Sequence, residues 1–433
     1  MLAAALRHGA PDLEAVESAV RGAVLAVGAS ALGEFMTVVG SAAPAEPVEC
    51  PDCGRPMRAT GPRTKTVLTM LGQTAYTRSR YDCARCARSR YPGDEALDLA
   101  GSSRSPGVRR QAARLGAKEP FEQAAQDLLE LAGVKLSRKD AERIAEGIGE
   151  DIGRHGKNAR RPIRMGHNPP ALEHPPHTLY IELDGTGIPM VADELEDRKG
   201  KQPDGSAKTR EAKLGCVFTQ TTLDDQGRPI RDPSSTTYTG AIEDCHAFGW
   251  RLYAHAVERG LNQAARVALL GDGAEWIKNI AQTHFSNATR IVDLYHAKEH
   301  VATLCRLLFD HDLRKATRKR ERWWKLMDQG RIETIIVEAS ALLPKDPHHC
   351  KDARTEIAYL DKNKAYMRYE QFRAMGLFVG SGVIEAACKN LIGQRLKQSG
   401  MKWTERGANA IIELRCSILS NQFEDYWESR LTA

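Results

Sequence analysis

Apolar residues recur at helical spacing near the start of the chain. Between residues 11 and 37 they return every three or four positions, after a proline and an aspartate that are typical of a helix start. We therefore expect a helical N-terminal segment, without visible chemistry, over residues 1–45. The residues that would share one side of this helix are Leu13, Val16, Val20, Val24 and Val27.

A second helical pattern follows a stretch rich in proline, glycine and serine. Residues 121–149 predict a helix, a turn at Gly133 and a second helix that Ser137 caps, with Asp140 three residues further on. A helix-turn-helix presents its second helix to DNA in this way, although many helical hairpins share the pattern without touching DNA. The candidate DNA contacts near the start of the second helix are Arg138, Lys139 and Arg143.

Strand patterns begin at residue 178. Three consecutive strands precede helices that alternate with strands, which is the element order of an RNase H-like fold. In that order the first and fourth strands are neighbours in one sheet. The basic, proline-rich residues 154–177 should form an extended linker before the sheet. The charged helical pattern of residues 309–376 should be an insertion.

Three acids stand in settings that favour chemistry. Asp184 and Asp272 each end an apolar, β-branched run and are followed by glycine, so each should project from the end of a buried strand. Glu385 lies one turn into a helix that Ser381 can cap. Taken singly, Asp-Gly can simply form a turn, and an early helical glutamate can interact with the helix dipole. Together the acids predict a cluster that holds two Mg²⁺ or Mn²⁺ ions about 3.5–4 Å apart, as in nucleases.

Two cysteine pairs flank a β-rich stretch. Cys50 and Cys53 form one pair, Cys83 and Cys86 the other, and two residues separate the members of each pair. Four thiolates at this spacing can surround a Zn²⁺ ion and leave no open coordination position, so the site should be structural. Two disulfides or unrelated core cysteines are the alternatives, and disulfides are uncommon in the cytosol. We expect one zinc ion in this ribbon.

The distribution of charge favours a polyanionic partner. The net charge is only +6 over 433 residues, but basic residues are concentrated in residues 55–90, 154–164 and 314–325. Each cluster alone can be a solvated face, whereas three in one chain favour a phosphate backbone. No uncharged apolar run approaches the roughly 18 residues that span a bilayer, and no signal-peptide pattern is visible. We therefore expect a cytoplasmic, nucleoid-associated protein.

A short histidine motif offers a competing hypothesis. His296, Glu299 and His300 form His-x-x-Glu-His, the pattern of inverzincin metalloproteases. Five-residue matches are weakly specific, and histidines one helical turn apart are often structural. In a nucleic-acid enzyme, His296 would instead fall at the end of the fifth strand, where it could contact the scissile phosphate or steady a carboxylate.

Several blocks together resemble a known family. ELDGTGIPM, LGDGAEWI, IVDLYHAKEH, GSGVIEAACKN and the leading CPDCG are similar to those of ISKra-type bacterial insertion-sequence transposases, which belong to the DDE class and have Mutator-like relatives. The resemblance covers nearly the whole chain. It implies DNA cleavage and strand transfer at terminal inverted repeats, with Asp184, Asp272 and Glu385 as the acid triad. It also matches Asp293 and His296 to an Asp-x-x-His block, and it implies a homodimer or higher oligomer when DNA ends are synapsed.

Basic residues and a tryptophan follow Glu385. They could hold DNA near the metal ions by phosphate contact and stacking, although an ordinary amphipathic helix with a solvated basic face gives the same pattern. These candidate DNA contacts are Lys389, Arg395, Lys397, Lys402 and Trp403.

The sequence thus predicts a multidomain α/β transposase that binds DNA. A catalytically idle repressor or domesticated DNA-binding protein is the non-enzyme alternative. The expected segments are 1–45 (helical), 46–98 (zinc ribbon), 99–153 (helix-turn-helix-like), 154–177 (linker), 178–308 (first part of the RNase H-like catalytic domain), 309–376 (helical insertion) and 377–433 (C-terminal catalytic helices).

Overall fold

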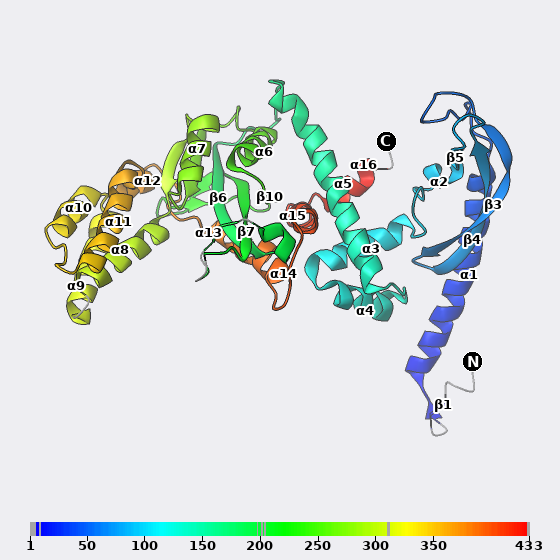
Figure 1. The fold of residues 1–433 in the computed structure, drawn as a ribbon, viewed down its shortest axis with the longest axis horizontal. Helices are drawn as coiled ribbons and strands as arrows, with labels where there is room; N and C mark the ends of the chain where they lie inside the picture. Colours follow the sequence, from blue (N-terminus) through cyan, green and yellow to red (C-terminus); the bar gives the residue numbers. More distant parts are fainter. Residues whose placement is uncertain are drawn as a thin grey trace. The chain divides into compact units, whose positions relative to one another are not determined.

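The structure is a computed structural model that describes residues 6–7, 10–196, 198–200, 202, 205–309 and 312–430. It contains two compact units, Met1–Ile148 and Gly149–Ala433, whose elements are labelled in Figure 1. The boundary between the two units falls inside a helix, because residues 148 and 149 both belong to α5 (Arg138–Arg164).

The first unit is built on a long hairpin with a helix along it. Strands β3 (Arg58–Thr69), β4 (Gly72–Asp82) and β5 (Ser89–Arg90) form an antiparallel sheet in that order, and α1 (Leu13–Ser41) packs on β4. Glycines allow this close approach: a Cβ atom on Gly33 would meet Thr74 Oγ1 at 2.5 Å. The strands β1 (Leu6–Arg7) and β2 (Ala10–Pro11) pair ahead of α1.

One side of α1 is not buried. The apolar residues expected to share one side of this helix are exposed, and the buried residues lie elsewhere on it, at Ala29, Gly33, Met36 and Gly40. By length and composition alone, α1 is also a helix that could cross a membrane. Its longest run without a charged residue, residues 22–33, still falls short of the roughly 18 residues expected of a spanning segment, as the sequence indicated.

Helices complete the first unit. They are α2 (Pro92–Ala96), α3 (Pro106–Lys118), α4 (Phe121–Ala132) and the first part of α5. The predicted turn is confirmed: Gly133 ends α4 in the left-handed region with φ 70°, and Ser137 Oγ accepts from the N–H of Asp140 at 3.0 Å. However, α5 continues to Arg164, so residues 154–164 are helical and do not belong to an extended linker.

The second unit contains a mixed five-stranded sheet in the order β10-β7-β6-β11-β12. The central strand β6 (Thr178–Pro189) pairs antiparallel with β7 (Thr209–Gln220) and parallel with β11 (Arg266–Gly271). β10 (Thr237–Ala241) and β12 (Thr289–Val292) lie at the edges. The first and fourth main strands are therefore neighbours, as the sequence predicted. β8 (Thr222–Leu223) and β9 (Pro229–Ile230) form a separate small ribbon.

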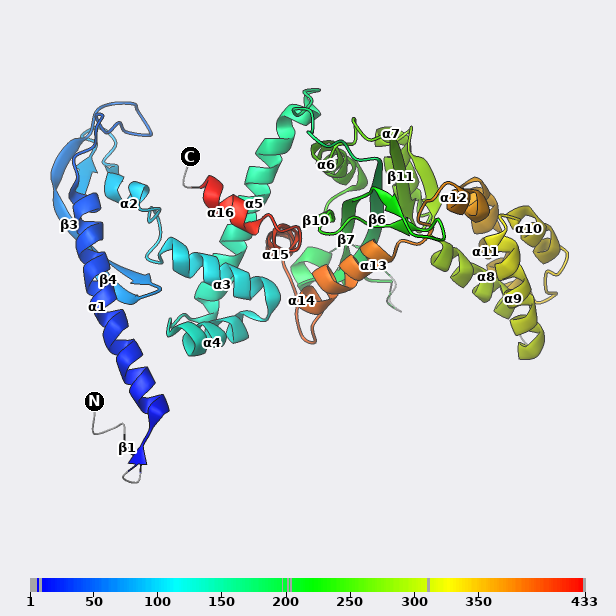
Figure 2. The same ribbon diagram turned by 180° about the vertical axis from the view of Figure 1, so that it is seen from behind.

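Two faces of the sheet carry different helices. Leu179, Ile181 and Leu183 of β6 pack in one core with residues of α6 (Cys245–Glu258) and α7 (Glu275–His284). Because side chains alternate along a strand, the intervening residues of β6 point to the opposite face, where α13 (Gly382–Ala387) contacts β6 and β7. Figure 2 shows α13 beside these strands.

The expected insertion is helical in the described residues. It follows α8 (Leu294–Leu308) and comprises α9 (Leu313–Asp328), α10 (Ile332–Ser340), α11 (Pro347–Asn363) and α12 (Tyr369–Ala374), with a 3₁₀ turn at Lys364–Tyr366. After α13 come a π-helical turn (Cys388–Gly393), α14 (Gln394–Leu396), α15 (Glu405–Leu419) and α16 (Phe423–Ser429). A short 3₁₀ helix (Ala192–Leu195) lies between β6 and β7.

Candidate functional site

Asp184, within β6, and Asp272, directly after the neighbouring strand β11, lie at the same level of the sheet. β6 and β11 are parallel, with Glu182 opposite Leu270, so each aspartate lies two positions beyond this pair. Asp184 Oδ1 accepts from the N–H of Gly185 at 2.7 Å, and Asp272 Oδ1 accepts from the N–H of Ala274 at 2.8 Å. Burial raises the pKa of Asp184, and the charge of Asp272 raises it further. The sheet thus brings together two acids that repel each other.

Glu385 reaches the same site from α13. Burial raises the pKa of its carboxyl group, and the charges of Asp293 and Asp184 add to the effect. Cys388, one turn further along, donates its thiol to Asp184 Oδ2 at an S···O distance of 3.1 Å. Neighbouring carboxylates repel one another and so raise the pKa of each group. A bound cation offsets this repulsion and stabilises the charged form.

Ser381 does not cap α13 as expected. Its side chain makes no capping hydrogen bond. Instead, its hydroxyl and its backbone N–H donate to Asp293 Oδ2 at 2.9 and 2.5 Å, and the hydroxyl lies 3.4 Å from Glu385 Oε1. Asp293 is buried, and its Oδ1 accepts from the N–H of His296 at 2.6 Å. Asp293 therefore fixes the start of α8 against the segment that carries Glu385.

The acids do not form a tight ligand cage. Among the residues that the structure describes, only the four ribbon cysteines bring three or more His, Cys, Asp or Glu ligand atoms within 4.8 Å of one another. One oxygen each from Asp184, Asp272 and Glu385 therefore do not all lie within this distance of one another. Glu385 is exposed, however, and its side chain has several torsions through which the carboxylate can move. Carboxylate oxygens are the protein ligands that Mg²⁺ prefers, so the donor chemistry fits such an ion.

Glu182, which the sequence analysis did not single out, lies behind this site. Its side chain is fully buried, and its Oε2 accepts from the backbone N–H of Ile384 at 2.9 Å. Burial, with added repulsion from Asp293 and Glu385, raises the pKa of Glu182 to about 8. The sequence feature that could have identified Glu182 is an acid within an apolar strand. It lies two residues before Asp184 and therefore on the same face of the strand.

The helical insertion contributes to the site through α11. The hydroxyl of Tyr359 donates to the backbone oxygen of Asp272 at 2.7 Å, and its ring stacks on His300 with centroids 3.7 Å apart. His300 Nδ1 lies 2.5 Å from Glu356 Oε2, and its Nε2 lies 3.2 Å from His296 Nε2. Both ring nitrogens of His300 thus have partners, while Glu299 is 81% exposed in its side chain. This arrangement does not favour a zinc site at His-x-x-Glu-His.

The structure divides the predicted DNA contacts into two groups. Arg395 and Trp403 are buried, so their prediction as DNA contacts was wrong. The guanidinium of Arg395 lies 5.0 Å from the ring centre of Trp403, and Trp403 Nε1 donates to the backbone oxygen of Leu396 at 3.0 Å. Both side chains therefore hold the chain after α13 together. The exposed predicted contacts are Arg138, Lys139, Arg143, Lys389, Lys397 and Lys402.

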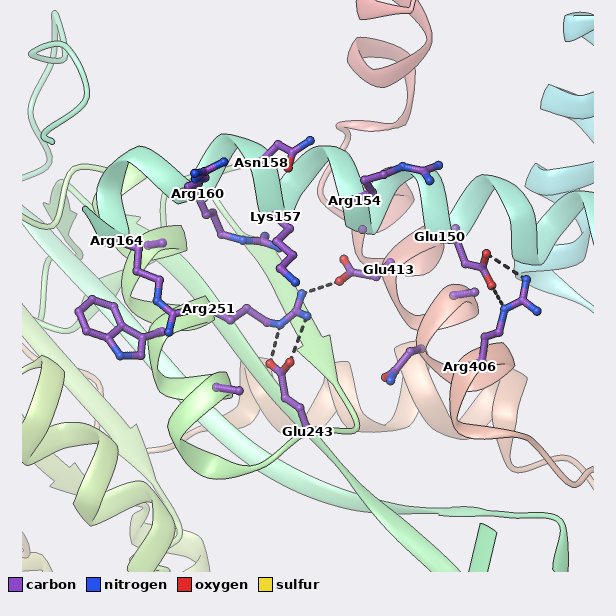
Figure 3. Close-up of a pocket in the computed structure, with 18 of the residues that line it drawn as sticks. Glu150, Arg154, Lys157, Asn158, Arg160, Arg164, Glu243, Arg251, Arg406 and Glu413 are labelled. Carbon is purple, nitrogen blue, oxygen red and sulfur yellow. Dashed lines mark hydrogen bonds and ion pairs between the residues drawn. The ribbon is translucent and has the colours of Figure 1, made fainter. Parts of the chain in front are cut away.

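A basic pocket of about 1070 Å³ lies elsewhere in the second unit, between α5, α6 and α15. In Figure 3, Lys157, Arg160 and Arg164 extend from α5 toward it. The acids of its lining are Glu150, Glu243 and Glu413, and all are paired with Arg406 or Arg251. Burial lowers the pKa of Arg160, and the charge of Arg251 lowers it further. The lining of the pocket therefore has more basic than acidic side chains.

The cysteine cluster has the geometry of two zinc knuckles. In each one, the first cysteine accepts through its backbone oxygen from the residue four positions later: Gly54 N–H donates to Cys50 at 2.9 Å, and Ala87 N–H donates to Cys83 at 3.0 Å. Backbone N–H groups of Cys86 and Arg85 lower the pKa of Cys83 to about 7. The four thiols, all within 4.8 Å of one another, can bind a zinc ion.

Comparison with known proteins gives relatives whose names state no activity. No model of a known protein family matches the sequence. The "UPF0236 protein in vanSb 3'region" of Streptococcus gallolyticus is 23% identical over 372 residues, which cover 84% of this chain and 75% of that protein. A UPF0236 protein of Caldanaerobacter subterraneus subsp. tengcongensis is 21% identical over 368 residues, covering 81% of this chain and 67% of the relative. The chain is thus similar over most of its length to proteins named UPF0236.

Proposed function

We propose that the protein is a DNA transposase of an insertion sequence, which cleaves and joins DNA strands at terminal inverted repeats with the help of divalent metal ions. The observation that carries this proposal is the register of β6 and β11, which sets Asp184 beside Asp272 although the two are far apart in sequence. Glu385 faces them from α13 and shares their electrostatic environment. The order of the five strands agrees with the order expected for an RNase H-like catalytic domain.

Asp184, Asp272 and Glu385 would hold two Mg²⁺ or Mn²⁺ ions. Such ions supply an activated water or 3′-hydroxyl at one side of the phosphorus atom and stabilise the leaving oxygen at the other. Around them, Asp293 and Glu182 position α13. His296, in the first turn of α8, would contact the phosphate or steady a carboxylate. The protein needs no covalent nucleophile of its own in this scheme.

The distribution of positive charge supports DNA as the partner. The pocket beside α5 offers Lys157, Arg160, Arg161 and Arg164 with no further acid in its described lining beyond the three paired glutamates. Exposed basic residues also follow Glu385, among them Lys389 and Lys402. Phosphate contacts of this kind bind a nucleic acid without reading its sequence.

The relatives add an argument of another kind. The name of the Caldanaerobacter protein joins many locus designations of one genome. A protein that is encoded repeatedly in one genome is what a mobile element produces when it copies itself to new sites.

A strand-cleavage assay tests the proposal. The zinc-loaded full-length protein, end-labelled DNA that carries the element's ends, and Mg²⁺ or Mn²⁺ should give metal-dependent cuts. Asp272→Asn should abolish cutting and retain DNA binding, whereas Asp225→Asn, in the exposed turn between β8 and β9, should cut normally. A repressor would bind equally well in all forms and cut in none. If the protein instead hydrolyses peptides and His300→Ala abolishes this activity, the result would support the alternative that the chain is a His-x-x-Glu-His metalloprotease.

A further inference from the structure

Helix α1 is apolar on two opposite sides. One side, with Gly33, Met36 and Gly40, packs against the hairpin of β3 and β4. The other side consists of large apolar side chains whose exposed fractions range from 36% at Val16 to 71% at Val38. Figures 1 and 2 show the first part of α1 extending past the hairpin. Contiguous exposed apolar surface of this extent marks an interaction site.

The exposed side follows a regular repeat. Apolar residues, all large except Ala31, return at intervals of three, four and four positions, so that the pattern repeats every eleven residues. An eleven-residue repeat corresponds to about 3.67 residues per turn, close to the period of a straight helix, and is typical of right-handed coiled coils. The apolar stripe consists of Leu13, Val16, Val20, Val24, Val27, Ala31, Phe35 and Val38, all of them exposed.

The area of the stripe approaches that of a stable interface. From Leu13 to Val38 it extends about 38 Å at 1.5 Å per residue. Each large side chain on it can bury roughly 60–120 Å² of apolar surface. The stripe therefore offers on the order of 400–800 Å², compared with about 800 Å² per partner in a standard stable interface.

We propose that the apolar stripe of α1 pairs with the same stripe of a second copy of this chain. A helix with a regular eleven-residue repeat packs best against a helix with the same repeat. A second copy of the chain provides such a helix, with the same length and spacing. Glu17, Arg21 and Glu34 border the stripe with charge, as in water-exposed coiled coils, whereas a helix surrounded by lipid is apolar on every side. The pairing does not depend on the proposed DNA chemistry.

Sedimentation equilibrium of the zinc-loaded full-length protein tests this pairing. Val20→Glu with Val27→Glu places two charges on the stripe and should weaken dimerisation at least 100-fold. Ser18→Glu with Ser30→Glu adds the same charge at exposed positions off the stripe and should leave the dimer intact. Val24→Ser with Val27→Ser, which adds no charge, should weaken it in the same direction. Circular dichroism and zinc content should stay unchanged in all three.

Two results would overturn the inference. The first is an equal mass of wild type and of both stripe variants, whether all are monomers or all are oligomers. The second is a monomeric wild type that co-sediments with phosphatidylcholine–phosphatidylglycerol vesicles while the Val20→Glu, Val27→Glu variant does not, because a lipid surface would then cover the stripe.

Discussion

Glu182 Oε2 accepts a hydrogen bond from the backbone N–H of Ile384 at 2.9 Å, although 202 residues separate the two in sequence. This bond ties the central strand β6 to the first turn of α13, the helix that carries Glu385. Since Asp184 lies two residues beyond Glu182 on the same strand face, this bond helps to fix the backbone positions that carry two of the proposed metal ligands, Asp184 and Glu385. Because the Glu182 side chain is fully buried, ionising it in the folded state is unfavourable.

Glu182→Gln should change the pH dependence of stability. The folded-state pKa of about 8 lies above the ordinary value of 4.5, so the group favours the folded state fully below pH 4.5, and this contribution is lost as the pH rises through 8. The amide can still accept from Ile384 N–H but does not titrate. Between pH 5 and 8, wild type should therefore lose up to about 1.4 kcal/mol per pH unit relative to the variant. Urea unfolding at several pH values measures this, and parallel curves would contradict it.

The cysteine cluster should bind one zinc ion per chain. Cys83→Ser should lose the metal and destabilise the ribbon, because zinc binding contributes directly to the folding of such small modules. Cys245→Ser, at the start of α6, changes a cysteine outside the cluster and should keep the full zinc content. Metal analysis of the purified proteins decides the matter, and equal zinc in both variants would rule out the assigned ligands.

Ala87→Gly should strengthen the second zinc knuckle. Ala87 has φ 50°, and Gly54, at the equivalent position of the first knuckle, has φ 68°. Glycine adopts this left-handed conformation without strain, whereas alanine does not. We expect Ala87→Gly to stabilise the protein by about 0.5–1 kcal/mol and Gly54→Ala to destabilise it by at least as much. Thermal unfolding with zinc present measures both, and shifts of the same sign would contradict the explanation.

The basic pocket should contribute to DNA affinity. Lys157→Glu with Arg161→Glu should weaken binding at least tenfold and flatten its salt dependence, since fewer phosphates are neutralised. Arg228→Glu with Lys351→Glu reverses the same amount of charge at exposed positions outside the pocket and should have a much smaller effect. Fluorescence anisotropy over a range of salt concentrations compares them. Equal losses in both pairs would mean that only net charge matters.

Strands and local turns could be predicted from the sequence. Apolar β-branched runs before Asp184 and Asp272 marked two strands, and the element order made those strands neighbours. Only Asp272 follows a strand end, however; the prediction that Asp184 ends its strand was wrong, because β6 continues to Pro189 in its pairing with β7. The turn at Gly133 and the spacing of the cysteines are likewise local signals. Each of these features depends on a few adjacent residues, which is why the pattern alone was sufficient.

Features that depend on packing could not be predicted in this way. The sequence suggested that Arg395 and Trp403 lie on the surface. The π-helical turn at Cys388–Gly393 changes the direction of the side chains in the short helix that follows and carries Arg395, and Trp403 pairs with Met190 in an isolated β-bridge. Their burial follows from contacts with distant segments. The exposure of the apolar stripe of α1 could not be predicted either, because a helix that leaves such a side exposed has the same sequence pattern as one that buries it in a core.

The central claim is that Asp184, Asp272 and Glu385 share divalent cations. Electron paramagnetic resonance of Mn²⁺ added to the zinc-loaded protein measures this most directly. We expect wild type and Asp225→Asn to bind Mn²⁺ with the same affinity, and Asp184→Asn, Asp272→Asn and Glu385→Gln each to weaken binding at least tenfold. If all these proteins bind Mn²⁺ equally, or none binds it even with DNA present, the three carboxylates do not form a metal site.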